Sequence, residues 1–345
     1  MTAPISPIPL GNTAQYMPAE ILATYGNFYE IPRAIQGLDT TVIHIAPNGN
    51  VTHLTGPGAG QEGVYIVEML QGEQQLPFEQ VITESAFMWG AVIERTNYRQ
   101  RLINFRVAIY GPTTYQYQLC DNRWWQGQDE TQDGWLGVFT RFTGWRWIPV
   151  RPMKTVDTSQ KMDPVAYGNN LAIWDVDWIC QRPWYSKPAV FKTWTANGSP
   201  RDASGHYYGT VVLANQGDMQ TYAEYLITGA GTATVQDNNS ATMVALPPIL
   251  ASDGPCLCDT DPQNRTLTAA NDPVDNLFYQ YLRSSSVLNF LLSNLGEAGE
   301  PWWQRGYVRF IYTVPPQTVV QFSVAHTNPN ATITVMLTQR FKRSR

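Results

Sequence analysis

The stretch LANQGDMQTYAEYLITGAGTATVQDN, residues 213–238, places the polar run Asn215-Gln216-Gly217-Asp218 between two apolar runs. It continues with Tyr225-Leu226-Ile227, a glycine break and another run with the alternation of a β-strand. We predict a turn in which the Asn215 side chain bonds to its own backbone and Gly217 takes a positive φ. The stretch contains no evident nucleophile and no metal-ligand spacing. It therefore indicates architecture, namely the start of successive strands, rather than chemistry.

The composition of the 345-residue chain indicates a globular protein, because 43% of its residues are hydrophobic and only 15% are charged. Its length suffices for two domains of roughly 100–200 residues each. The net charge of −5 argues against bulk binding to nucleic acid or to anionic membranes. Twelve tryptophans, 18 tyrosines, 26 glycines and 24 prolines indicate strands punctuated by turns. Aromatic residues at this density suit sandwich cores, protein interfaces and sugar-binding faces alike.

Targeting and redox signals are weak. No apolar run approaches the length of about 20 residues that a membrane span needs. Residues 1–12 lack the basic and apolar regions of a secretory signal. The four cysteines include no CxxC pair, and we predict that all are small, buried, unpaired thiols: Cys120, Cys180, Cys256 and Cys258. We therefore expect a soluble protein made in a reducing compartment, with no membrane span.

Residues 41–55, TVIHIAPNGNVTHLT, have the pattern of a hairpin. Asn48-Gly49 is the strongest short hairpin signal, because both central residues of a type I′ turn need a positive φ. A two-residue turn would pair Ile43 with Leu54 and His44 with His53, with the histidine Cβ atoms roughly 5 Å apart. We favour two half-exposed histidines over half of a metal site or a pH-sensitive contact, because no third ligand is in view.

Most of the remaining chain also has strand patterns, and turn signals recur at the spacing typical of a sandwich or barrel. Trp174, Val176 and Trp178 share one face of a predicted strand, with Asp175 and Asp177 on the other. The helical signal is limited to Pro77–Trp89 and Asp275–Leu295. We predict a mainly β fold with one or two short helices and with strands over residues 64–70, 102–110, 171–180, several stretches within 209–246, 307–312, 318–325 and 331–341.

Residues 183–205 are rich in proline, glycine, serine and lysine, which is typical of a domain boundary. We therefore predict two domains, residues 1–188 and residues 189–345.

The chemical motifs are weak. Residues 58–63 match G-x-G-x-x-G but precede a predicted strand, whereas a dinucleotide fingerprint opens a helix. Residues 259–264 resemble the start of a calcium loop, but they lack its glycine, and we favour a turn with Asx hydrogen bonds. The acidic residues Asp129, Glu130 and Asp133 have the pattern of a solvated loop. We predict no catalytic, cofactor-binding or metal-binding residues and no cofactor.

Basic and aromatic residues form local groups that suit contacts with partners. We predict Arg95, Arg99, Arg101 and Arg106 as candidate contacts to a neighbouring subunit or to a lumen. A second basic group comprises Arg141, Arg146, Arg151 and Lys154, and the chain ends Arg340-Phe341-Lys342-Arg343-Ser344-Arg345. For both, solvated strand faces and a frayed tail are the favoured interpretation. Trp302 and Trp303 are candidate aromatics facing a partner or a sugar, although a core position is equally plausible.

The opening stretch resembles the first hairpin of the C-terminal domain of siphophage distal tail proteins, which has an N-x-G-[DN] turn followed by a strand and a glycine. Residues 258–262 with Arg265-Thr266-Leu267 are similar to the DTDP…RTL segment of this minor tail protein in phages of actinobacteria. Residues 54–70, 99–111 and 178–185 resemble the family's N-terminal belt domain. Residues 219–223 depart from the pattern, because they lack the family's proline.

The resemblance implies a structural, non-enzymatic protein of the virion at the tip of a long non-contractile tail, assembled in the host cytoplasm. It implies a belt domain that resembles a β-sandwich or barrel and forms a homo-hexameric ring, and a galectin-like C-terminal β-sandwich. The implied partners are other copies of the chain, the major tail tube protein, the tail tip hub or tail-associated protein and other minor tail proteins. The implied roles are host attachment and genome ejection, with DNA passing through the lumen.

Two other classes of function stay open. One is a carbohydrate-binding module of the virion that recognises a host surface, motivated by the aromatic content and the galectin-like resemblance. The other is a tail-associated glycosidase or peptidase, for which no supporting motif is present.

Overall fold

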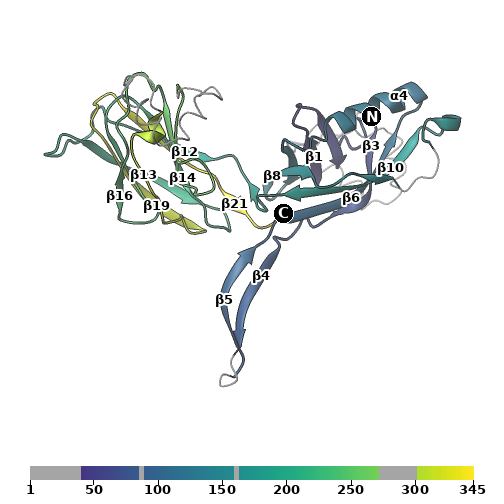
Figure 1. Cartoon of the computed structure of the whole chain (residues 1–345), viewed down its shortest axis with the longest axis horizontal. Helices are drawn as coiled ribbons and strands as arrows, with labels where there is room; N and C mark the ends of the chain where they lie inside the picture. Colours follow the sequence, from purple (N-terminus) through teal and green to yellow (C-terminus); the bar gives the residue numbers. More distant parts are fainter. Residues whose placement is uncertain (1–39, 85–88, 159–162, 272–300) are drawn as a thin grey trace, which may run out of the picture. The chain divides into compact units, whose positions relative to one another are not determined.

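The computed structural model describes residues 40–84, 89–158, 163–271 and 301–345, and these are mainly β, as predicted (Figure 1). The chain divides into two compact units. Unit 1 comprises residues 1–187 and 341–345, and unit 2 comprises residues 188–340. Unit 2 is therefore an insertion, because the chain leaves unit 1 and returns to it for its last five residues. The predicted domain 189–345 includes these five residues, which the structure places with unit 1.

Unit 1 is built on one large antiparallel sheet. Its strands follow the order β2-β1-β7-β8-β10-β6-β3, and the end strands β2 and β3 contact each other, so the sheet curves nearly into a barrel. The strands are β1 Thr41–Ile45, β2 Val51–Thr55, β3 Val64–Gln71, β6 Arg101–Tyr110, β7 Gly134–Thr140, β8 Gly144–Pro152 and β10 Leu171–Cys180, with short β9 Asp157–Thr158, β11 Tyr185–Ser186 and β21 Arg340–Phe341 at its margins.

The core of unit 1 lies inside this curved sheet. The alternation predicted for residues 171–180 is confirmed on β10, where Val176, Trp178 and Cys180 are buried. Ile103, Val107 and Ile109 of β6 and Leu136 and Val138 of β7 are buried in the same cluster. Period-2 burial of this kind explains why apolar alternation located β6 and β10 correctly, whereas β7 was not predicted.

The hairpin β1–β2 forms with a different register from the one predicted. Its turn has three residues, Pro47, Asn48 and Gly49, closed by a bond from the Ala46 N–H to the Asn50 carbonyl at 2.8 Å. Only Gly49 takes a positive φ, +85°, while the ring of Pro47 fixes the φ that the first position of a type I turn needs. A three-residue turn of this kind shifts the strand pairing by one residue relative to a type I′ turn.

The predicted pair of His44 and His53 is therefore wrong. His44 lies opposite Thr52 and His53 lies opposite Ile43, so the two imidazoles occupy opposite faces of the hairpin. His53 instead pairs with Glu62, with 2.8 Å between Nδ1 and Oε1.

His44 is buried in an aromatic cage. It is 3% exposed, and its ring centroid lies 5.8 Å from that of Trp124 and 4.6 Å from that of Trp178. Burial lowers the pKa of His44 to about 3. The folded protein therefore holds this imidazole neutral at pH values where the unfolded chain protonates it.

This burial predicts an acid-sensitive unit 1. Between pH 6.5 and about 3 the unfolded state binds the His44 proton and the folded state does not, so stability falls as pH falls, by about 1.4 kcal/mol per pH unit. We expect the variant His44→Phe, which keeps an aromatic ring in the cage, to lose this part of the pH dependence. The measurement is Tm against pH for both proteins. Parallel Tm profiles between pH 6.5 and 4 would contradict the prediction.

Helix α4, Thr114–Gln126, packs on the core of unit 1 and was not predicted. The hydroxyl of Thr113 accepts a bond from the Gln116 N–H at 3.3 Å, and Gly127 caps the other end. The capping threonine and the glycine after the last turn were the sequence signals for this helix. Only Tyr117 and Trp124 of the helix are buried, so its apolar periodicity is weak.

The two predicted helices have different outcomes. The helix predicted over Pro77–Trp89 is wrong, because Phe78–Glu84 forms strand β4, paired with β5 at Ala91–Tyr98. The β-branched run Val81-Ile82-Thr83 favours the strand. The helix predicted over Asp275–Leu295 lies outside the described residues.

Unit 2 contains two antiparallel sheets that enclose one core. The first has the order β12-β20-β14-β17-β18 and the second β13-β19-β15-β16. Their bounds are β12 Val190–Thr195, β13 Tyr207–Asn215, β14 Ala223–Thr228, β15 Ala233–Gln236, β16 Met243–Ala245, β17 Cys256–Asp259, β18 Leu267–Ala269, β19 Thr318–His326 and β20 Thr332–Leu337. The strand predicted over residues 307–312 is wrong, because the backbone N–H groups of Ile311 and Tyr312 bond to the carboxylate of Asp237 instead of to a neighbouring strand.

The turn at residues 215–218 forms with one of its two predicted features. The Asn215 side chain accepts a bond from the Gly217 N–H at 3.0 Å. The positive φ predicted for Gly217 is wrong. Glycine is needed there because a Cβ would lie 2.4 Å from the carbonyl oxygen of Arg340.

Candidate functional site

Strands β4 and β5, Phe78–Glu84 and Ala91–Tyr98, form a two-stranded arm that extends away from the large sheet of unit 1 (Figure 1). Its strands bond only to each other among the named sheets. Five large apolar residues of the arm are 46–59% exposed: Phe78, Ile82, Val92, Ile93 and Tyr98. An isolated two-stranded ribbon is marginally stable in water, and its free edges and apolar faces favour pairing with another chain. The arm is therefore a candidate interaction surface.

A groove of about 290 Å³ lies at the base of the arm. The C-terminal segment supplies two cations to its lining, Lys342 and Arg343, and no carboxylate lines it. The remaining lining residues are Gln75, Leu76, Phe78, Gln80, Thr96 and Tyr98. Its chemistry suits an apolar group that carries a negative charge.

The four arginines predicted as one contact group lie in three different settings. Arg95 and Arg99 are exposed on the arm or at its base, and Arg99 pairs with Glu79. Arg106 lies on the outer face of β6, bonded to Glu68 and Asp175 at 2.6 Å each. These residues are accessible to a partner.

The prediction that Arg101 contacts a neighbouring subunit or a lumen is wrong, because its side chain is 0% exposed and cannot reach either. Its Nε donates to the Pro183 carbonyl at 2.9 Å and its Nη2 to the Lys342 carbonyl at 2.7 Å. Its Nη1 donates to the carbonyls of Gly72 and Glu73. The planar guanidinium thus bonds to three segments of unit 1 that are distant in sequence from one another and from Arg101, namely residues 72–73, 183 and 342.

The C-terminal segment is packed rather than frayed. Phe341 is 6% exposed beneath the guanidinium of Arg146, which lies 4.1 Å from its ring centroid. Ser344 is fully buried, and Arg345 pairs with the buried Glu73 at 2.8 Å. The basic tail is therefore part of the folded body, and it brings Lys342 and Arg343 to the groove.

Side chains of the second basic group also bond to other residues of unit 1. Arg151 pairs with Asp133 at 2.8 Å and Lys154 with Asp177 at 2.7 Å. Arg146 donates to the Arg343 carbonyl at 2.8 Å. These contacts explain the acidic residues near them without any catalytic role.

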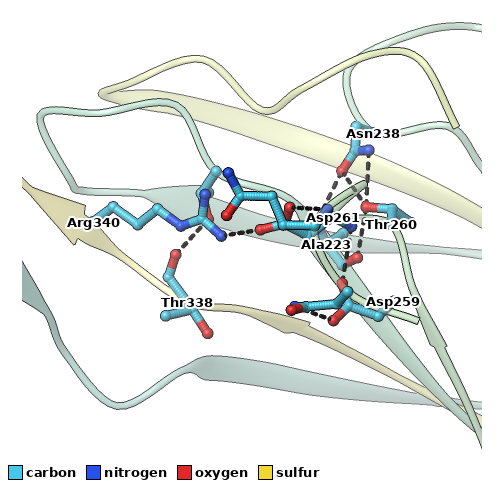
Figure 2. A network of polar contacts seen from close by, with 10 residues as sticks. Ala223, Asn238, Asp259, Thr260, Asp261, Thr338 and Arg340 are labelled. Carbon is cyan, nitrogen blue, oxygen red and sulfur yellow. Dashed lines mark hydrogen bonds and ion pairs between the residues drawn. The ribbon is translucent and has the colours of Figure 1, made fainter. Parts of the chain in front are cut away.

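In unit 2, the segment compared with a calcium loop is a turn held by its own carboxylates, as favoured from the sequence (Figure 2). Asp259 accepts from the Asp261 N–H at 2.9 Å, and Asp261 accepts from the Gln263 N–H at 3.0 Å. Arg340 donates to Asp261 at 2.5 Å. Burial and the neighbouring Asp259 raise the pKa of Glu224, beside this turn. The carboxylates are thus occupied by backbone groups and by Arg340.

Asn238 supports the same turn. Its side-chain oxygen accepts from the Ala223 N–H at 2.8 Å, and its nitrogen donates to Thr260 at 3.0 Å (Figure 2). The network anchors the turn to β14, so its role is structural. Among the described residues, no group of three or more histidine, cysteine or acidic side chains could hold a metal ion.

The two candidate aromatic residues, Trp302 and Trp303, differ in burial. Trp302 is fully buried in the core of unit 2, and its indole N–H donates to the Pro247 carbonyl at 3.1 Å, so it is not a sugar-facing residue. Trp303 is 43% exposed, with the guanidinium of Arg265 5.0 Å from its ring centroid. Only Trp303 of this pair is accessible to a ligand.

The other weak motifs form ordinary structure. The glycines of residues 58–63 form turns that lead into β3, not into a helix. Cys180, Cys256 and Cys258 are buried and Cys120 is partly buried, and none of the four forms a disulfide bond. In the part of the chain that the structure describes, no helix is long and apolar enough to cross a membrane.

No protein-family model and no curated protein matches this chain. Among solved structures, it is similar to the Dit (gp 19.1) protein of phage SPP1, described as a paradigm of the hub adsorption apparatus in phages that infect Gram-positive bacteria. The two are 12% identical, the match covers 88% of this chain and 99% of the Dit chain, and the TM-score is 0.50. A chain of the phage P2 baseplate in its activated conformation with calcium is 11% identical, with coverage of 87% and 98% and a TM-score of 0.49. The chain therefore shares the fold of the SPP1 Dit protein over most of its length.

Proposed function

We propose that this chain is a structural, non-enzymatic component of a phage tail tip that assembles with copies of itself. The observation that carries the proposal is the fold shared with SPP1 Dit, a hub protein, across nearly the whole of both chains. In the proposed assembly, unit 1 forms a homo-hexameric ring below the tail tube protein. The ring contacts the tip hub and other minor tail proteins, and it surrounds the passage for DNA.

The geometry of unit 1 supports self-assembly. A ring needs contacts between different surfaces of neighbouring copies, repeated by a rotation that closes. The arm offers one such surface, with exposed apolar residues and free strand edges, and the groove at its base offers a second one of different chemistry. A chain with two unlike docking surfaces can associate head to tail.

The test is the native mass and negative-stain image of the purified full chain at about 0.1 mg/mL and at ten times that concentration, since assembly responds to mass action. We expect closed rings with the mass of six copies of the 38.8 kDa chain, favoured at the higher concentration. A monomer at both concentrations, with the Tm of a folded protein, would contradict the proposed ring.

A glycan-binding role for unit 2 is the second candidate function. It is favoured by Trp303, whose ring is half-exposed. An array of glycans probed with the full chain and with Trp303→Ala separates the two proposals, because a ring component needs no glycan.

A further inference from the structure

A pocket of about 500 Å³ in unit 1 lies beside helix α4 and strand β10, and it shares no described lining residue with the arm or its groove. Its volume is within the range of small-molecule sites, about 300–1,000 Å³. Its lining comes from three segments: Tyr117, Gln118, Asp121 and Asn122 of α4, Asp163, Pro164 and Val165 of the segment before β10, and Trp174 of β10. The packing of unit 1 therefore brings together a set of polar and aromatic groups that no single stretch of sequence contains.

The pocket is negatively charged. It contains the carboxylates of Asp121, which is partly buried, and Asp163, which is exposed, and none of the described residues that line it is basic. In the part of the chain that the structure describes, neither carboxylate has an ion-pair partner. Burial raises the pKa of Asp121, which means that its negative charge is poorly compensated in the free protein. A cation that enters the pocket supplies this compensation.

Both carboxylates are held in place before any ligand enters. Asp121 Oδ1 accepts a bond from the indole N–H of Trp125 at 3.1 Å, and the hydroxyl of Tyr117 also bonds to this carboxylate. Asp163 Oδ1 accepts a bond from the Val165 N–H at 2.9 Å. An ionised carboxylate has about four acceptor positions, so each can still accept bonds from a ligand. Acceptors that are fixed in advance lower the entropic cost of binding.

Two aromatic rings, those of Tyr117 and Trp174, add to the lining. Trp174 contacts Trp125 edge-on, with 5.1 Å between the ring centroids. Aromatic rings attract cations, and a planar guanidinium stacks on them as well. The indole N–H of Trp174 is buried and has no acceptor among the described residues, so a ligand that brings an oxygen atom to it is favoured. A peptide that contains arginine carries both a guanidinium and carbonyl oxygens, whereas a bare cation carries only the charge.

We propose that this pocket binds a guanidinium group, presented as an arginine side chain by a peptide segment of another protein, and that Asp121 and Asp163 pair with it. The five donors of a guanidinium form a rigid fork that fits carboxylates, whereas the ammonium of lysine is compact and strongly hydrated. The pocket is formed within one copy of the chain and does not involve the arm. It therefore goes beyond the proposed ring and does not depend on it.

The experiment is isothermal titration calorimetry of the full chain with acetyl-arginine methylamide, a minimal arginine peptide. Acetyl-citrulline methylamide is the matched neutral ligand, because it has nearly the same shape without the charge. We expect saturable binding of the arginine compound, and binding of the citrulline compound that is weaker by about tenfold or more. Agmatine carries a guanidinium without peptide carbonyls, and we expect it to bind more weakly than the arginine compound. Equal affinity for agmatine would overturn a peptide as the source of the guanidinium.

Two variants locate the site. Asp121→Asn and Asp163→Asn each remove one charge but keep an oxygen that can accept the bonds from Trp125 and Val165. We expect each to weaken binding of the arginine compound by about tenfold, with an unchanged Tm. Glu130→Gln is the matched control, because it removes an exposed negative charge of unit 1 from a residue outside the described lining. It should leave the affinity unchanged.

Three results would each overturn the site: no saturable binding to the folded unaltered chain, equal affinity for the arginine and citrulline compounds, or unchanged affinity in both aspartate variants. These results are distinct from failure of the proposed ring, because the titration measures binding to each chain whether or not chains assemble. A monomeric chain that binds the arginine compound would contradict the ring and support the pocket.

Discussion

Replacing Arg101 with methionine is expected to lower the free energy of unfolding of unit 1 by about 3–5 kcal/mol. Methionine keeps much of the aliphatic volume but removes every donor of the guanidinium. The carbonyls of Gly72, Glu73, Pro183 and Lys342 then lose their bonds to that group. A buried carbonyl without a partner costs about 1–3 kcal/mol, partly recovered where water enters.

The measurement is thermal unfolding followed by tryptophan fluorescence, with an expected fall in Tm of about 10 °C for a unit of this size. Arg99→Met is the matched control, because Arg99 is two-thirds exposed in its pair with Glu79 and exposed ion pairs contribute little. If Arg101→Met and Arg99→Met had the same Tm, the bonds from Arg101 to the four carbonyls would not contribute to the stability of unit 1.

Replacing Trp302 with alanine is expected to destabilise unit 2 by about 3–5 kcal/mol, the usual cost of removing a large buried aromatic side chain. Trp302 is fully buried among the strands of both sheets, and its indole N–H satisfies the Pro247 carbonyl. The substitution leaves a cavity and an unpaired carbonyl together. The measurement is the denaturant midpoint of the full chain, read from a signal of unit 2 such as hydrogen exchange on β14 and β20.

Trp303→Ala is the matched control, since the two residues are adjacent and differ in burial. We expect it to change stability by less than about 1 kcal/mol. Any loss of glycan binding in Trp302→Ala would therefore report unfolding, whereas loss in Trp303→Ala alone would report a binding face. Equal destabilisation by both variants would contradict the assignment of Trp302 as the core anchor.

The hairpin at residues 41–55 shows why strands are easier to predict than their contacts. Apolar alternation over five residues located β1 and β2, because burial of alternate side chains is a local property of each strand. The register depended on whether Pro47 belongs to the strand or to the turn. Because the register differs by one residue from the predicted one, His44 does not lie opposite His53. Its ring instead contacts aromatic rings of α4 and β10.

The arm is a case in which the sequence did not predict even the type of secondary structure correctly. Residues 78–84 contain helix-forming and strand-forming residues together, and the partner strand decided between them. Its exposed apolar surface could not be predicted from composition, because the same residues in another strand would be core. The spacing of Arg95, Arg99, Arg101 and Arg106 likewise did not reveal that one of the four is fully buried.

The sequence by itself determined the mainly β class, the strands β1, β2, β3, β6 and β10 of unit 1, several strands of unit 2, the Asx turns at Asn215 and Asp259, and the resemblance that indicated a phage tail protein. These features depend on residues a few positions apart, whose preferences act wherever the chain goes. The tertiary structure alone decided the hairpin register, the burial of Arg101 and Trp302, the return of residues 341–345 to unit 1 and the groove at the base of the arm. Each of these joins segments separated by tens to hundreds of residues, and such contacts are selected by the summed packing and hydrogen bonding of the whole unit rather than by any local pattern.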